Sequence, residues 1–207
     1  MDLHVYIPAF VTLFVVIDPI GLTTIFVALT KGATPSQRRT IAIRAWAVAA
    51  ALLTMFGVFG EAVLGFLGIS MSAFRIAGGM LLFLTALDML FERRGQRRKD
   101  QSETGMDAAD DPSVFPLATP LIAGPGAMAS MILLSGEAAD WTQVLMVHLV
   151  MLSVLAVVII FFLSAGVLER VLRETGINVL TRLLGMLLAA LAVQFVLDGL
   201  ADFGFLG

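Results

Sequence analysis

The sequence predicts an all-α membrane protein whose six transmembrane helices form two inverted three-helix repeats, with helices 1 and 4 broken. The first observation is composition: 59% of the 207 residues are hydrophobic and 14% are charged, whereas soluble domains have about 25% charged residues. The second is a set of six apolar segments of spanning length. The third is a pair of proline–glycine interruptions, Asp18–Gly21 and Gly124–Gly126, inside the first and fourth segments.

The six apolar segments have the length that a bilayer crossing requires, which is about 20 residues. We expect spans at residues 7–29, 41–64, 73–91, 115–135, 142–166 and 180–201. The second helix is expected to begin in the cytosol, ahead of its span. Its start is marked by Thr34, Pro35 and Gln37, which combine an N-cap, a first-turn proline and a capping-box partner.

A polar segment, 93–111, separates the two sets of three spans, changes from basic to acidic and has no apolar period. We expect it to be a mobile cytoplasmic linker that joins a first repeat at 1–92 to a second at 112–207. Asp111 and Pro112 offer a cap for the helix that follows the linker. The whole chain is expected to form one integral membrane domain.

The basic residues predict the orientation, because Lys and Arg are enriched in cytoplasmic loops. Arg75 alone lies at the opposite side, near the start of the third span. Both termini are therefore expected to face outward, away from the cytosol. The other 12 of the 13 basic residues lie in or beside the loops after the first, third and fifth spans: Lys31, Arg38, Arg39, Arg44, Arg93, Arg94, Arg97, Arg98, Lys99, Arg170, Arg173 and Arg182.

The two halves of the chain repeat each other at a nearly constant spacing. Pro19 and Pro125 lie 106 residues apart, and Arg75 and Arg182, at the starts of the third and sixth spans, lie 107 apart. Because three is an odd number of spans, the second half enters the membrane from the opposite side and the repeat is inverted. Glycines follow both arginines and are expected to let helices approach closely: Gly78, Gly79 and Gly185.

The paired interruptions predict a binding site near the bilayer midplane. Proline removes a backbone donor and glycine lets the chain leave helical geometry, so polar groups are freed in hydrocarbon and need partners. Asp18 near the centre costs about 2.5–3.5 kcal/mol on insertion scales, so we expect it to face the bundle interior. The ends of half-helices attract carboxylates and cations, which suits a small amino acid. The alternative is a pair of kinks that serve only packing.

The expected substrate-binding residues are the interruptions and nearby hydroxyl side chains: Asp18, Pro19, Gly21, Thr24, Gly124, Pro125, Gly126 and Ser130. Arg75 is a candidate gate that pairs with Asp18 or Glu61, the alternative being an interfacial arginine that reaches water. His148 is either a proton-coupling group or a buried, hydrogen-bonded histidine.

Three stretches, 18–21, 74–84 and 116–128, resemble the MarC family of bacterial and archaeal membrane proteins, and the resemblance covers nearly the whole chain. It implies a six-span inner-membrane protein related to neutral amino-acid transporters. Many relatives carry asparagine directly after the Asp-Pro-Ile-Gly motif, where this chain has Leu22. That departure implies a different specificity if the position contacts substrate.

These observations favour a secondary transporter or exporter of small neutral solutes such as amino acids, working by alternating access with H+ or Na+ as candidate coupling ions. No enzyme activity, cofactor, metal or nucleic acid is expected, since the chain has no cysteine, two histidines and no hydrolase, metalloprotease or P-loop motif. The expected partners are the bilayer and the solute, with the oligomeric state left open. Two alternatives remain: a non-transporting scaffold or accessory subunit, and a translocator of lipid-linked substrates.

Overall fold

The computed structural model describes residues 6–94, 97–98, 111–165 and 174–204. Within these ranges the regular secondary structure is helical throughout, which confirms the all-α prediction for this part of the chain. The segments are α1 (Ile7–Ile17), α2 (Pro19–Leu29), α3 (Pro35–Phe66), α4 (Met71–Leu90), the irregular helix η2 (Ser113–Ile122), α6 (Pro125–Gly136), α7 (Trp141–Leu163) and α9 (Glu174–Asp202).

Among the described residues, five stretches are long and apolar enough to cross a membrane, and a sixth results if η2 and α6 count as one span. One of the five stretches, Ile7–Leu29, contains both α1 and α2. η2 and α6 are bent by 57° relative to each other at their junction. All these stretches coincide closely with the spans expected from the sequence.

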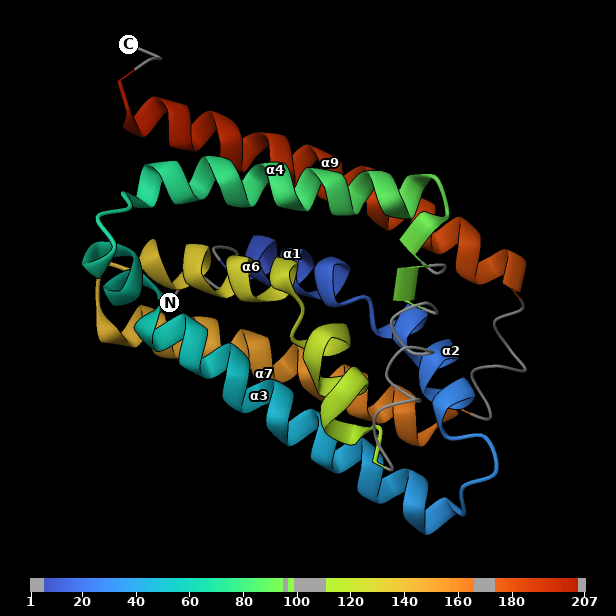
Figure 1. The fold of residues 1–207 in the computed structure, drawn as a ribbon. Coiled ribbons are helices and arrows are strands. Elements are labelled where there is room, and N and C mark those ends of the chain that lie inside the picture. Colours follow the sequence, from blue (N-terminus) through green and yellow to red (C-terminus); the bar gives the residue numbers. More distant parts are fainter. Residues whose placement is uncertain (1–5, 95–96, 99–110, 166–173, 205–207) are drawn as a thin grey trace.

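α1 and α6 lie at the centre of the bundle (Figure 1). α4 and α9 run side by side along one face, α3 and α7 lie on the opposite face, and α1 and α6 lie between them. In the most apolar 18-residue part of the α1–α2 stretch, 67% is buried inside the protein. The corresponding share is 28% in each of the other four spans. The α1–α2 stretch therefore packs mainly against protein, while the outer helices keep large apolar surfaces free for lipid.

Short polar signals start the helices as the sequence predicts. The Thr34 hydroxyl accepts a hydrogen bond from the Gln37 N–H at 3.3 Å, and the Gln37 side chain accepts from the Thr34 N–H at 2.8 Å, so the capping box before α3 is confirmed. The Asp111 carboxylate accepts from the Ser113 N–H at 3.0 Å, although the N-cap residue of η2 is Pro112, which makes no side-chain cap hydrogen bond. Hydrogen bonds from Ser113 lower the pKa of Asp111, and its ion pair with Arg44 acts in the same direction.

Glycines bring α4 and α9 into close contact, as expected. A Cβ added at Gly79 would lie 2.8 Å from the carbonyl oxygen of Ala192, and one added at Gly185 would lie 3.2 Å from that of Ala86. Gly78 serves a different neighbour, since its added Cβ would meet the side chain of Leu133 in α6 at 2.9 Å. Both helices therefore rely on missing side chains where their backbones approach.

Several expectations concern residues that the structure does not describe. Both chain ends, most of the expected linker (99–110) and the segment 166–173, which includes Arg170 and Arg173, lie outside the described residues. The described part of the linker includes Arg94 and Arg98, whose side chains lie against α1 in the bundle interior.

Replacing Gly79 with leucine is expected to destabilise the protein, because the main-chain oxygen of Ala192 cannot move aside unless α4 and α9 separate. Overpacking of this kind costs about 1–3 kcal/mol, which thermal unfolding in detergent would measure. Gly65→Leu is the matched control, since no atom of the described residues lies within 4 Å of a Cβ added there. Equal destabilisation of both variants would contradict the role assigned to Gly79.

Candidate functional site

The chain turns at Asp18, where α1 ends and α2 begins. Asp18 has φ 56° and ψ 69°, in the left-handed region that few residues other than glycine adopt. Its N–H donates to the carbonyl oxygen of Phe14 at 2.8 Å, and its carboxylate accepts from the N–H of Gly21 at 3.0 Å. A Cβ added at Gly21 would lie 2.3 Å from Asp18 Oδ2. Asp18 therefore caps both helices, and Gly21 makes room for its carboxylate.

Arg98, from the segment after α4, meets this turn from the other side. Its Nη1 lies 3.0 Å from Asp18 Oδ2, and its Nη2 donates to the carbonyl oxygen of Ile17 at 2.9 Å. The side chains of Asp18 and Arg98 are only 3% and 8% exposed, so they form a buried ion pair. Charge pairs of this kind survive burial when hydrogen bonds also satisfy their remaining polar atoms.

Arg94 also binds backbone carbonyls at the end of α1. Its guanidinium donates to the carbonyl oxygens of Val15 and Val16 and also contacts the sulfur of Met89. The last carbonyls of a helix have no partner within it and carry the negative pole of the helix dipole. The two arginines together supply those carbonyls with positively charged donors.

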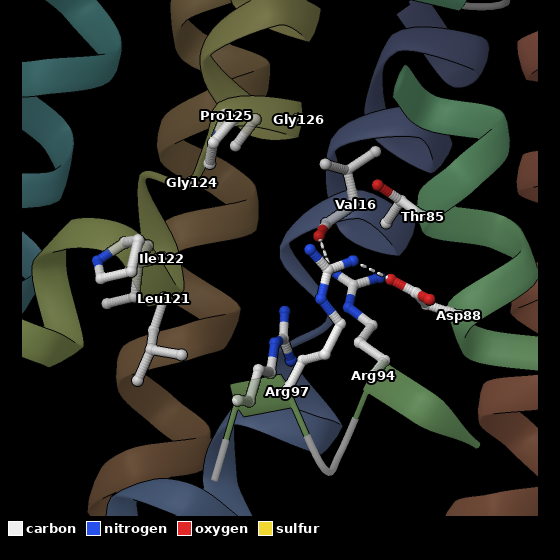
Figure 2. Close-up of a pocket in the computed structure, with 13 residues that line it drawn as sticks. Val16, Thr85, Asp88, Arg94, Arg97, Leu121, Ile122, Gly124, Pro125 and Gly126 are labelled. Carbon is white, nitrogen blue, oxygen red and sulfur yellow. Dashed lines mark hydrogen bonds and ion pairs between the residues drawn. The ribbon is translucent and has the colours of Figure 1, made fainter. Parts of the chain in front are cut away.

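A cavity of about 120 Å³ opens beside this turn (Figure 2). Four parts of the chain form its walls: the end of α1, the last turns of α4, the arginine segment and the η2–α6 junction. Polar groups on the walls include the Thr85 hydroxyl, the Asp88 carboxylate and the guanidinium groups of Arg94, Arg97 and Arg98. Val16 and the junction around Gly124–Gly126 complete the lining.

The η2–α6 junction is tightly folded at Gly124 and packs against α1 at Gly126. A Cβ added at Gly124 would lie 2.6 Å from the carbonyl oxygen of Pro120, and one added at Gly126 would lie 3.2 Å from Val16 Cγ1. α6 then begins at Pro125 without a side-chain cap. The start of α6 and the end of α1 therefore meet at the cavity.

The structure divides the expected binding residues into two groups. Gly124, Pro125 and Gly126 line the cavity, and Asp18 reaches it through its ion pair with Arg98. The remaining four residues are not among those that line the cavity: Pro19, Gly21, Thr24 and Ser130.

The two expected hydroxyls instead bind carbonyls of their own helices. The Thr24 hydroxyl donates to the carbonyl oxygen of Gly21 at 2.8 Å, and the Ser130 hydroxyl donates to that of Gly126 at 2.9 Å. Bonds of this type satisfy carbonyls near a helix start and leave the hydroxyl directed along its own helix.

Arg75 forms its ion pairs with residues other than Asp18. Its guanidinium forms ion pairs with Asp202 at 2.6 Å and Glu137 at 3.2 Å, which ties the start of α4 to the ends of α9 and α6. The predicted pairing of Arg75 with Asp18 or Glu61 is therefore wrong. Burial raises the pKa of Glu137, while the neighbouring Arg75 acts to lower it.

His148 is buried in α7 and does not line the cavity. Its Nδ1 lies 2.8 Å from the carbonyl oxygen of Val144, so that nitrogen donates the hydrogen bond. Its Nε2 has no hydrogen-bond partner among the described residues. This geometry agrees with the interpretation as a buried, hydrogen-bonded histidine.

Sequence reasoning missed Arg94 and Arg98 as site residues. They stand four positions apart in a basic cluster directly after a span, which is also the ordinary signature of a cytoplasmic loop. The spacing does place them on one face of a helical turn. Arg93 and Arg97, whose side chains are exposed, have the same spacing, so no signal in the sequence distinguishes the inserted pair from a solvated charge run.

Comparison with known proteins places the whole chain in one group. The family model described as "MarC family integral membrane protein" matches residues 3–203. The chain belongs to the MarC family. This agrees with the resemblance carried by the motifs around Asp18, Gly78 and Gly124.

Relatives of this MarC-family chain occur in archaea and bacteria. "UPF0056 membrane protein MJ1677" of Methanocaldococcus jannaschii is 39% identical over 97% of this chain and 98% of its own length. A "UPF0056 membrane protein" of Archaeoglobus fulgidus is 38% identical over 97% of this chain and 94% of its own. "UPF0056 inner membrane protein YhgN" of Escherichia coli K12 is 35% identical over 94% of this chain and 95% of its own length. No solved structure matches the chain.

Replacing Arg98 with alanine is expected to destabilise the protein strongly, because it leaves the buried Asp18 carboxylate without its cation. Removing one partner of a buried pair costs about 3–5 kcal/mol. Arg97→Ala is the matched control, since the Arg97 side chain, which pairs with Asp88, is 68% exposed. Exposed ion pairs contribute about 0–1 kcal/mol. Denaturant unfolding in detergent would compare the two variants.

The double variant Asp18→Asn, Arg98→Gln separates charge loss from packing loss. It is expected to recover a large part of the stability that Arg98→Ala loses, because neither buried charge remains. Additive effects of the two single substitutions would contradict direct coupling between the residues.

Proposed function

We propose that this protein is a secondary transporter or exporter of small neutral solutes, with amino acids as the substrate class, working by alternating access. The observation that carries the proposal is the meeting of two helix ends at one cavity: the end of α1 beside Asp18 and the start of α6 at Pro125. In secondary transporters, discontinuous helices of this kind bind substrate and coupling ions near the midplane.

Reciprocal contacts between α4 and α9 support an inverted repeat. Gly79 approaches Ala192, and Gly185 approaches Ala86. The two glycines lie 106 positions apart, as do the two alanines, so a twofold rotation would exchange the two contacts. Pro19 and Pro125 have the same spacing.

Ion pairs at both ends of the α4–α9 pair follow the same pattern. Arg75 at the start of α4 pairs with Asp202 at the end of α9, and Arg182 in α9 pairs with Glu92 just after α4. An arrangement with one such pair at each end suits a bundle that rocks between two states, because a pair can break at one end while the other holds.

The proposal predicts flux of labelled glycine or alanine in proteoliposomes, driven by an imposed H+ or Na+ gradient. Asp18→Asn and Pro125→Ala are each expected to lower the initial rate about tenfold or more, which corresponds to about 1.4 kcal/mol in the rate-limiting barrier. Arg93→Gln is the control, since Arg93 is exposed and does not line the cavity.

Wild-type flux no greater than that of an Asp18→Ala, Pro125→Ala double variant would refute transport of these solutes. Reconstituted protein that folds but moves neither amino acid under either gradient would favour the scaffold alternative. Flux of a lipid-linked probe in its place would favour the third alternative.

We also propose that both termini face outward in the inner membrane, on the strength of the charge distribution. The chain has no cysteine, so single cysteines report accessibility without background. An impermeant maleimide added to intact spheroplasts is expected to label Leu67→Cys, which is 61% exposed at the end of α3. It should label Lys31→Cys only after permeabilisation, and the reverse pattern would contradict this orientation.

A further inference from the structure

Among the described residues, those that line the cavity or pair with its lining carry more positive than negative charge. Arg98 is paired with Asp18, and Arg97 is paired with Asp88. Arg94 contacts backbone carbonyls and a thioether sulfur, and no carboxylate pairs with it among the described residues. Within the part of the chain that the structure describes, three guanidinium groups and two carboxylates leave one positive charge without an anionic side chain.

The helix dipoles do not remove this excess. α1 ends at the cavity with a partial negative charge, and α6 begins there with a partial positive charge, each worth about half an elementary charge. These contributions offset each other. The first turn of α6 has no side-chain cap, and the helix N–H groups of Gly126 and Ala127, which both line the cavity, have no acceptor within the helix.

The size and remaining walls of the cavity restrict what could supply the missing anion. Its volume of about 120 Å³ is somewhat below that of an engineered cavity of about 150 Å³ that binds benzene, so it suits a molecule of a few non-hydrogen atoms. Val16, Leu121 and Ile122 give it an apolar side. A planar guanidinium binds a carboxylate with two parallel hydrogen bonds better than it binds a spherical ion.

We propose that this cavity binds the carboxylate group of a small aliphatic solute, with Arg94 as the cationic contact and the start of α6 as the second donor. The inference rests on the proposed transport of small solutes for its biological meaning, and it names the chemical group by which the site selects them. Arg94 then exchanges part of its bonding with the α1 carbonyls for the ligand carboxylate.

Ligand binding to the full-length protein in mild detergent tests the proposal without any transport step. The probes are acetate and its neutral isostere acetamide, with sodium chloride at matched ionic strength. Acetate is expected to raise the thermal unfolding temperature of the wild type in a saturable way, and acetamide and chloride are not. Acetamide or chloride acting as well as acetate, or no response of the wild type to acetate, would overturn the proposal.

Variants at two adjacent arginines identify the contact. Arg94→Gln is expected to weaken acetate binding at least about tenfold, and Arg94→Lys should retain part of it because the charge remains. Arg93→Gln, which removes the same charge from an exposed side chain that lies over the Phe91 ring, should bind as the wild type does. Unchanged acetate affinity in a folded Arg94→Gln variant would overturn the assignment.

Carboxylate binding at this cavity and transport of amino acids can fail independently of each other. Carboxylate binding that depends on Arg94, without any amino-acid flux, would support this site and refute the proposed transport. Glycine flux that glycinamide matches in rate would support transport and overturn carboxylate recognition, because glycinamide lacks the carboxylate.

Discussion

The backbone carbonyls at the end of α1 and the carboxylate of Asp18 lie in the protein interior, where water cannot satisfy them. Polar groups left alone in such surroundings are costly, and a buried charge is more costly still. Arg94 and Arg98 resolve both needs, because their guanidiniums bind the carbonyls and one of them also neutralises Asp18. The position of the arginine segment, the room left by Gly21 and the cavity beside Val16 all follow from this cluster.

Much of the fold could be predicted because its determinants are local. The bilayer sets the length of the apolar stretches, and the capping box at Thr34 depends on residues that are close in sequence. Glycines such as Gly79 mark places where a helix can be approached closely, whatever the partner is. The breaks could be located because Pro19 and Pro125 interrupt otherwise apolar segments. These features need no knowledge of which helix lies beside which.

The candidate site could be predicted only in part, because its charge arrangement depends on contacts between distant residues. Arg98 and Asp18 are 80 positions apart, and a basic cluster after a span has the same appearance whether it stays in water or folds inward. The same difficulty affected Arg75, whose partners Glu137 and Asp202 lie at the ends of other helices. Small residues around Gly124 could be recognised from composition, whereas the side chains facing them could not.

The separation between Asp18 and Arg98 also has a consequence for how the chain is made. Asp18 is synthesised 80 residues before Arg98, an interval of about 4–16 s at typical elongation rates. During that interval neither arginine can reach Asp18 or the carbonyls before it. The nascent first span must therefore stay beside water, the insertion machinery or the membrane interface until its own permanent partners arrive, and its final seating in the bundle is a late event in biogenesis.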